Sequence, residues 1–184
     1  MRTLSVLKEV DLIAAEDTRH TLKLLNHYNI KKPLISYHEH NKKSKGEVLL
    51  RKLNEGMQIA LVTDAGMPGI SDPGEDIIRL CIEEGIVVVA LPGPTAPILA
   101  LVLSGLPTDK FVFEGFLPSK KQDRIKELER LKTEERTIIL YEAPHRILAL
   151  LQDIFNILGD RKSSISRELT KIHEETFRGS IAEA

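Results

Sequence analysis

The sequence predicts an α/β protein built of two subdomains. Strand-like and helix-like segments alternate along nearly the whole chain, and some of the strand-like ones, such as Ile86–Leu91, are continuously apolar. Continuously apolar strands that alternate with helices indicate a mainly parallel sheet covered on both faces. A stretch with proline, glycine and a basic pair, Leu106–Lys121, interrupts the alternation. We therefore expect an N-terminal subdomain of residues 1–106 and a C-terminal subdomain of residues 107–184.

The individual elements follow from apolar spacing and from the glycines and prolines that separate them. Strands are expected at Asp11–Ala15, Pro33–Tyr37, Gln58–Thr63, Ile86–Leu91, Arg136–Tyr141, Ser163–Arg167 and Glu174–Arg178. Helices are expected at Thr18–Tyr28, Lys45–Asn54, Glu75–Glu84, Thr95–Ser104, Gln122–Lys132 and His145–Leu158.

Composition limits the class of protein. Of the 184 residues, 42% are apolar and 29% charged, which is typical of a globular chain with a core. The net charge of −1 does not indicate a nucleic-acid binder, although a local basic patch can still bind one. Cys81 is the only cysteine, so an intrachain disulfide is excluded and a cytoplasmic location is expected. No signal peptide and no membrane span are expected, because the apolar runs are too short.

Two loops lie where α/β proteins bind ligands, at the carboxyl ends of strands. Val62–Gly74 reads VTDAGMPGISDPG and joins a buried strand to a helix; Leu91–Pro97 reads LPGPTAP and repeats that design. Glycines allow a close backbone approach to a ligand, and a helix start offers free N–H groups. The alternative is a pair of structural turns, with Asp72 as a helix cap in the first. Neither loop is a Walker A or GxGxxG motif.

Other polar clusters carry weaker signals. Basic residues gather at Lys31-Lys32, Lys42-Lys43-Lys45 and Lys120-Lys121-Arg124, and as a set they could follow an RNA backbone. His38 and His40 could share one face of a strand, but the sequence favours a solvated loop over a metal site.

Six strings along the chain carry a resemblance to a known family: DLIAAEDTRHT, VTDAGMPGISDPG, LPGPTA, FEGFLP, YEAPHR and SRELTKIHEE. Together and in this order, they resemble the small-subunit ribosomal RNA methyltransferases of the tetrapyrrole (corrin/porphyrin) methylase superfamily. The resemblance implies two α/β subdomains with the cofactor cleft between them. It also implies 2′-O-methylation of a cytidine in 16S ribosomal RNA of the small ribosomal subunit, S-adenosyl-L-methionine as the cofactor, and a homodimer. No metal is expected, because the histidines lack a metal-ligand pattern.

The same resemblance implies a cofactor site on both loops and in the second subdomain. The matching positions are Asp64, Ala65, Gly66, Ser71, Asp72, Pro92, Gly93, Thr95, Ala96, Tyr141, Arg167, Leu169 and Thr170.

Catalysis on a ribose hydroxyl would require a base, because the hydroxyl is a weak nucleophile until its proton is removed. The candidates are Glu16, Asp17, Glu142 and Glu168. Arg19, Arg146 and Arg167 are the candidates for holding phosphates. The alternative is that these carboxylates and arginines pair with each other across the subdomain interface, and the sequence does not choose between the two.

The family resembled here usually begins with a strand and a Thr-Pro-Ile-Gly-Asn loop ahead of its first helix, whereas this chain begins inside that helix, at Arg2–Val10. We therefore expect a chain truncated at both ends, without a central strand and one wall of the cleft. Two alternatives to the RNA methyltransferase are a methylase of a corrin or porphyrin precursor and an inactive binding module.

Overall fold

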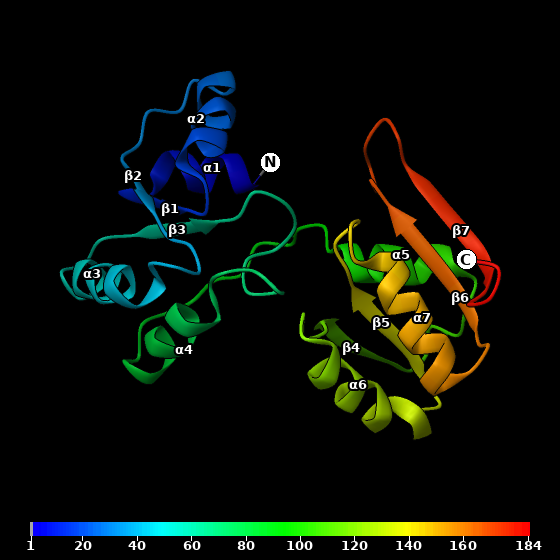
Figure 1. Cartoon of the computed structure of the whole chain (residues 1–184). Coiled ribbons are helices and arrows are strands. Elements are labelled where there is room, and N and C mark those ends of the chain that lie inside the picture. The colour runs from blue at the N-terminus through cyan, green and yellow to red at the C-terminus, as the bar shows by residue number, and fades with distance from the viewer. Residues whose placement is uncertain (1) are drawn as a thin grey trace. The chain divides into compact units, whose positions relative to one another are not determined.

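The computed structural model describes residues 2–184, and the chain separates into two compact units, residues 1–94 and 95–184 (Figure 1). The division lies before the boundary expected at residue 106. Helix α5 (Ala96–Ser104), which the sequence pattern assigns to the first subdomain, therefore belongs to the second unit.

The first unit is a three-stranded parallel sheet between two pairs of helices. Its elements are α1 (Arg2–Glu9), β1 (Leu12–Ala15), α2 (Thr18–His27), β2 (Leu34–Ser36), α3 (Lys42–Asn54), β3 (Ile59–Val62) and α4 (Glu75–Glu83). The strand order is β2-β1-β3, and β1 pairs in parallel with both neighbours. The expected parallel sheet is therefore confirmed for this unit. Helices connect its strands, as parallel pairing requires.

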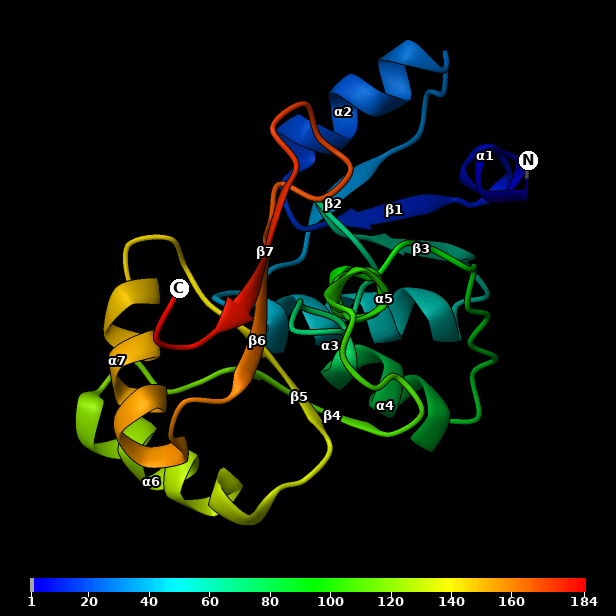
Figure 2. The ribbon, with the colours of Figure 1, turned by 90° about the vertical axis from the view of Figure 1, so that its right-hand side faces the viewer.

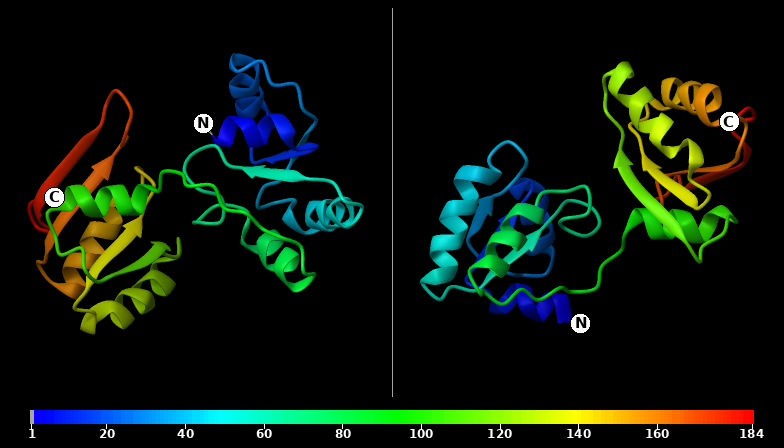
Figure 3. Two further views of the ribbon diagram at one scale, coloured as in Figure 1. Left: turned by 180° about the vertical axis from the view of Figure 1, so that it is seen from behind. Right: turned by 90° about the horizontal axis from the view of Figure 1, so that it is seen from below.

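Strand β1 is buried over its whole length and supplies both faces of the core. Leu12 and Ala14 lie in a cluster that includes residues from α3 and α4, namely Leu49, Ile77 and Cys81. Ile13 points to the other face. It lies in a cluster with Leu7 of α1 and Leu25 of α2. Figures 1 and 3 show the corresponding layers, with α1 and α2 on one side of the sheet and α3 and α4 on the other.

The second unit contains two small sheets. Its elements after α5 are β4 (Phe111–Phe116), α6 (Lys121–Arg130), a short 3₁₀ turn (Leu131–Thr133), β5 (Thr137–Tyr141), α7 (Ile147–Leu158), β6 (Lys162–Arg167) and β7 (Glu175–Ser180). Strands β4 and β5 pair in parallel, and β6 and β7 form an antiparallel hairpin. Figure 2 shows α6 and α7 side by side. They share a core cluster with Leu128, Leu150 and Ile154.

The strand expected at Ile86–Leu91 is wrong. These residues run as an extended stretch without a strand partner in the described part of the chain (Figure 3). Val87 is 85% exposed and Val89 63% exposed. β-Branched residues favour extended backbone, but a strand also needs a neighbouring backbone to accept and donate hydrogen bonds. The local preference is present here, and the pairing is not.

Strand β4, which the sequence pattern does not predict, lies inside Leu106–Lys121, the stretch interpreted as a junction. The pairing of β4 with β5 shifts register between Phe113 and Gly115, and Gly115 has a φ of +61°. A glycine at a bulge interrupts the alternation that identifies a strand in a sequence. The remaining expected elements are confirmed with small differences at their ends; α3, for example, begins at Lys42 rather than at Lys45.

Within residues 2–184, no helix combines the length and the apolar character needed to cross a membrane.

An ion pair lies inside the second unit. The Arg124 guanidinium of α6 donates to Asp153 Oδ2 of α7 from Nε at 2.9 Å and from Nη2 at 2.6 Å. The two side chains are only 7% and 6% exposed. A buried charge without its partner is costly, so this pair fixes how α6 and α7 meet.

Replacing Asp153 by Ala should destabilise the second unit by about 3–5 kcal/mol, because the Arg124 charge is left buried and unpaired. The matched control is Asp123→Ala, which removes an exposed carboxylate from α6 and should change stability by less than about 0.5 kcal/mol. Urea unfolding followed by circular dichroism measures both. Equal unfolding midpoints for the two variants would contradict the assignment.

Candidate ligand-binding site

Polar side chains gather at one edge of the parallel sheet of the first unit. Glu16 and Asp17 follow β1, His38 comes two residues after β2, and Thr63 and Asp64 follow β3. Because the three strands are parallel, their carboxyl ends meet at this edge. The sheet therefore brings together residues that are far apart in the sequence.

Glu16 connects the ends of β1 and β3. Its Oε2 accepts a hydrogen bond from the Thr63 hydroxyl at 2.5 Å and one from the Asp64 backbone N–H at 3.2 Å. Oxygen Oε1 is not used by these two bonds. Thr63 is not among the predicted site residues, because the sequence pattern places it inside the strand.

The two glycine-rich loops come into contact, as expected from their positions after successive apolar segments. A Cβ built on Gly93 would lie 3.3 Å from Met67 Cγ, and one on Gly66 would lie 3.6 Å from the Pro94 carbonyl. Gly66 also has a φ of +87°, a backbone conformation that residues other than glycine rarely adopt. The loops present bare backbone at their meeting point, which leaves room for a ligand to approach it.

Asp72 is not the helix cap that the alternative interpretation proposed. The N-cap of α4 is Gly74, and a Cβ there would lie 3.0 Å from both Leu61 Cδ2 and the Gly69 nitrogen. Burial raises the pKa of the Asp72 carboxyl, and the nearby charges of Glu16 and Asp64 raise it further, while a hydrogen bond with Thr63 partly offsets the rise. Asp72 is therefore held more protonated than an ordinary aspartate.

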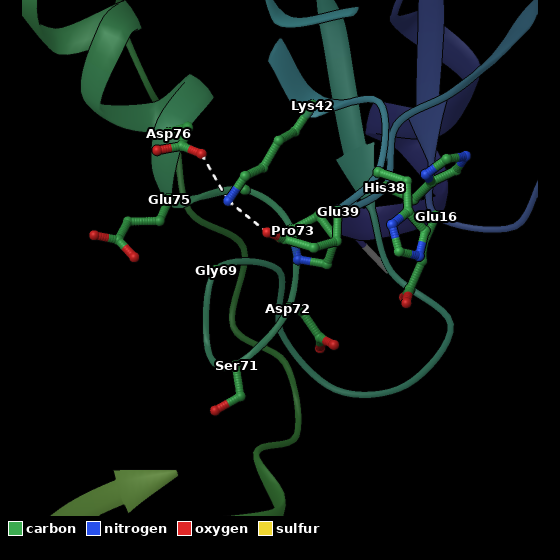
Figure 4. Close-up of a pocket in the computed structure, with 12 residues that line it drawn as sticks. Glu16, His38, Glu39, Lys42, Gly69, Ser71, Asp72, Pro73, Glu75 and Asp76 are labelled. Atoms are coloured by element: carbon green, nitrogen blue, oxygen red, sulfur yellow. Dashed lines mark ion pairs between the residues drawn. The ribbon is translucent and has the colours of Figure 1, made fainter. Parts of the chain in front are cut away.

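A cavity of about 540 Å³ opens beside the first loop (Figure 4). Its lining combines Glu16 with residues of the loop and of the segment that follows β2. The lining residues are Glu16, His38, Glu39, His40, Lys42, Gly69, Ser71, Asp72, Pro73, Gly74, Glu75 and Asp76. Lys42 is the only lysine or arginine among them, and it pairs with Glu39 at 2.8 Å and with Asp76 at 3.0 Å. The cavity therefore carries a net negative charge.

Asp17 and Arg19 form a local pair at the start of α2. Asp17 caps the helix by accepting from the Arg19 backbone N–H at 2.8 Å, and it also binds the Arg19 guanidinium at 2.6 Å. Hydrogen bonds from Arg19 hold the pKa of the Asp17 carboxyl well below its usual range. Asp17 is therefore a stable anion occupied by its neighbour, which weakens its case as a general base.

His20 adds a further contact at this edge. Its Nδ1 lies 3.1 Å from Asp64 Oδ2. Ligand atoms of Asp17, His20 and Asp64 lie within 4.8 Å of one another, a spacing that suits a metal ion. The Arg19 guanidinium already binds the Asp17 carboxylate, so a cation there would have to displace a positive charge.

The segment after β2 is a loop, as the sequence favours, but it is only partly solvated. His40 is exposed, but His38 is half-buried. The Asn41 amide oxygen accepts from the His38 backbone N–H at 2.9 Å, and its nitrogen lies 3.1 Å from His38 Nε2. The pair His38 and His40 is the sequence signal that could have identified this segment as part of the cavity lining.

In the second unit, Glu142 and Arg146 pair with each other. Glu142 is 3% exposed, and its Oε2 lies 3.1 Å from Arg146 Nη2. Arg146 also donates to the backbone carbonyl of Leu117 at 3.1 Å. This arrangement connects the loop after β5 to Leu117, the first residue after β4, and gives both Glu142 and Arg146 a partner within the second unit.

The candidates from the last motif lie at or beside the β6–β7 hairpin connection. Arg167 ends β6 and binds Glu175 of β7 through Nε at 2.6 Å, and Glu168 pairs with Lys171 at 3.2 Å. The positive φ values of Glu168 and Thr170 (52° and 67°) follow from the tight turn, in which Leu169 also lies. Tyr141 lies at the end of β5, with its ring centroid 5.2 Å from that of Phe113.

Three of the candidate residues' ion pairs lie within a single unit: Asp17 with Arg19, Glu142 with Arg146, and Arg167 with Glu175. Glu175 is not among the predicted site residues, and pairing across a subdomain interface stays a prediction. Of the remaining candidates, Ala65 and Ser71 lie on the first loop, Pro92 on the second loop just after the extended stretch, and Thr95 and Ala96 at the start of α5.

A parallel sheet with glycine-rich loops and acidic side chains at its carboxyl edge defines a ligand-binding α/β protein. All 184 residues match the model of the tetrapyrrole (corrin/porphyrin) methylases. The chain belongs to this family.

Individual relatives agree with this assignment. The ribosomal RNA small subunit methyltransferase I of Synechocystis sp. is 55% identical over 184 residues, 100% of this chain and 66% of that protein. The protein of the same name from Halalkalibacterium halodurans is 54% identical over 183 residues, 100% of this chain and 63% of that protein. This chain thus spans just under two thirds of their length.

A solved structure shares the fold. Uroporphyrin-III C-methyl transferase from Thermus thermophilus, complexed with S-adenyl homocysteine, aligns with a TM-score of 0.62 at 16% identity. The alignment covers 99% of this chain and 81% of that chain.

The Asp72 environment predicts a pH-dependent stability. A raised pKa in the folded state means that the ionised carboxylate is disfavoured by folding, so stability is lost as the pH rises through this pKa. Asp72→Asn should therefore raise the thermal unfolding midpoint at pH 7. The gain should vanish below the ordinary aspartate pKa of about 3.9.

Asp76→Asn provides a control of opposite sign, because hydrogen bonds from Lys42 lower the pKa of Asp76. This variant should be less stable than the parent at pH 7 and should converge with it in acid. Thermal unfolding across a pH series measures both variants. A lower midpoint for Asp72→Asn at pH 7 would overturn the assignment.

Proposed function

We propose that this chain is an S-adenosylmethionine-dependent methyltransferase that modifies the ribose 2′-oxygen of a cytidine in 16S ribosomal RNA. The observation that carries the proposal is identity of 54–55% along the whole chain to proteins named ribosomal RNA small subunit methyltransferase I. A cytoplasmic location and a homodimer belong to the same proposal.

The residues at the sheet edge fit such a cofactor. Bare backbone at Gly66 and Gly93 leaves space that a Cβ would narrow. Asp64 and Asp72 supply carboxylate oxygens, which suit ribose hydroxyls and an ammonium group as hydrogen-bond acceptors. An acidic surrounding also favours a positively charged sulfonium over an anionic ligand. We assign Asp64, Ala65, Gly66, Ser71, Asp72, Pro92 and Gly93 to this role.

S-adenosylmethionine, when bound, supplies an electrophilic methyl group on a positively charged sulfur. The task left to the protein is to orient the acceptor hydroxyl and to remove its proton. The family resemblance also gives a cofactor-binding role to six residues of the second unit, and that role stays a prediction: Thr95, Ala96, Tyr141, Arg167, Leu169 and Thr170.

Among the four carboxylates that could take the proton, we favour Glu16. It lines the cavity, whereas Asp17 is held by Arg19 and Glu142 is buried against Arg146. Glu168 lies on the exposed hairpin connection. The bonds from Thr63 and Asp64 fix Oε2 of Glu16, so the carboxylate is already oriented before substrate arrives.

The acidic cavity also argues against the alternative substrate class. A corrin or porphyrin precursor carries several carboxylates, which Glu16, Asp72 and Glu75 would repel. A ribose hydroxyl carries no charge and can donate to such groups.

Incubation of the 184-residue chain with methyl-labelled cofactor and small ribosomal subunits tests the proposal. The expected result is label in 16S RNA at a nucleotide whose 3′ phosphodiester bond resists alkaline hydrolysis, because the methylated 2′-oxygen cannot attack it. Cofactor binding by calorimetry without label in the RNA would overturn the substrate assignment. Absence of both would overturn the methyltransferase assignment.

Glu16→Gln should slow methyl transfer by about a hundredfold or more, because general-base catalysis contributes at least that factor. Glutamine retains an acceptor oxygen for Thr63 and Asp64, so the fold and the cofactor affinity should change little. Glu168→Gln is the control and should keep most of the parent rate. Single-turnover rates at saturating cofactor decide the matter; equal rates for Glu16→Gln and the parent would exclude Glu16 as the base.

A further inference from the structure

Helix α2 and the segment after it carry positively charged side chains and no negatively charged ones. Residues 18–37 contain four lysines and arginines and no aspartate or glutamate, whereas the whole chain has 26 basic and 27 acidic residues. Protein surfaces ordinarily mix the two signs. The acidic groups that pair with Arg19 and His20 lie outside this segment: Asp17 binds Arg19, and Asp64 binds His20.

Helical spacing places the two cations of α2, Arg19 and Lys23, on one exposed side of the helix together with His27. Arg19, Lys23 and His27 repeat every four residues and therefore share a stripe. His20, Leu24 and Tyr28 form the adjacent stripe. The opposite side carries the buried residues Thr21 and Leu25. Figure 1 shows α2 as an outer element of the first unit, and no other helix or strand of that unit covers its outer side.

An exposed aromatic ring accompanies the charges. Tyr28 is 41% exposed and packs edge-on against His27, with ring centroids 4.8 Å apart. Lys31 is exposed and Lys32 half-buried just after the helix. An exposed ring close in the sequence to unpaired lysines suits single-stranded nucleic acid, since bases can stack on the ring while the cations neutralise phosphates.

One residue in each of the other two basic clusters already has an acidic partner. Lys42 is bound by Glu39 and Asp76, and Arg124 is buried against Asp153. Lys23, Lys31 and Lys32 have no ion pair among the described residues. The basic side of α2 also starts at the candidate site, because Asp17, its N-cap, directly follows Glu16.

From these observations we infer that the outer side of α2, together with the segment that follows the helix, binds the backbone and a base of the RNA substrate. This surface is defined by Lys23, His27, Tyr28, Lys31 and Lys32. The inference rests on the proposed function and identifies where RNA approaches the site. The acidic cavity takes the uncharged hydroxyl, and the basic helix takes the phosphates. The separation of charge holds the strand in place without drawing a phosphate into the reaction centre.

Binding of a short fluorescein-labelled single-stranded RNA, measured by anisotropy over a range of salt concentrations, tests the inference without turnover. In the Lys23→Gln/Lys31→Gln/Lys32→Gln variant, affinity should fall about tenfold or more. The slope of log affinity against log salt should decrease by about 2, at roughly 0.7 for each phosphate that a lysine no longer neutralises. The control variant removes three exposed lysines of the second unit, Lys110, Lys132 and Lys162, and should change neither quantity.

Tyr28 gives a second, charge-neutral test. Tyr28→Ala should weaken RNA binding by about tenfold, since stacking on one base is worth about this factor, and Tyr28→Phe should restore it. An equal fall of affinity in both triple-lysine variants, or no fall in either, would overturn the inference.

Anionic phosphatidylserine vesicles separate RNA from a membrane surface. Loss of vesicle binding in the α2 variant with unchanged RNA affinity would also overturn the inference. Because RNA affinity is measured without the cofactor, a chain that fails to transfer methyl groups would contradict the proposed function and leave the α2 result readable.

Discussion

The parallel pairing of β1 between β2 and β3 is the constraint on which the first unit depends. Strand β1 is buried along its length, so Leu12 and Ala14 must face one helical layer and Ile13 the other. Parallel strands also end at the same edge, which brings Glu16, Thr63 and Asp64 together although Glu16 is 47 or 48 positions from the other two. The site therefore follows from the sheet. A shift of β1 by one residue would exchange its two faces and dissolve both the core and the site.

Electrostatics then divides this unit into two regions of opposite sign. Several carboxylates gather at the edge where the parallel strands end. Burial raises the pKa of Asp72, and repulsion from the negative charges of Glu16 and Asp64 raises it further. Helix α2, which leaves the same edge, carries cations that its own sequence does not neutralise. The net charge of −1 hides this division, because opposite regions cancel in the sum. A small unit can in this way present one surface to an uncharged group and another to a polyanion.

Local pattern predicted most of the fold, and pairing decided where it failed. Apolar spacing located β1, α2, β3 and α4 to within a few residues, because burial on one or two faces leaves a period in the sequence. The pattern could not reveal that Ile86–Leu91 lacks a partner or that a bulge at Gly115 hides β4. The site was predictable to the level of loops, since glycines mark them. That Glu16 lines the cavity depends on its tertiary contacts with Thr63 and Asp64, which lie 47 and 48 positions away, and no spacing rule contains those.

The extended stretch at Ile86–Leu91 has a consequence for how the protein behaves in concentrated solution. Its valines are exposed, and its backbone N–H and C=O groups have no ladder partner in the described part of the chain. A β-branched segment of this kind is a template onto which another extended chain can add as a strand. Self-association through this stretch would grow with concentration and with temperature, and would produce intermolecular β-structure without unfolding of either unit. A lysine at Val88 would act as a gatekeeper against such growth.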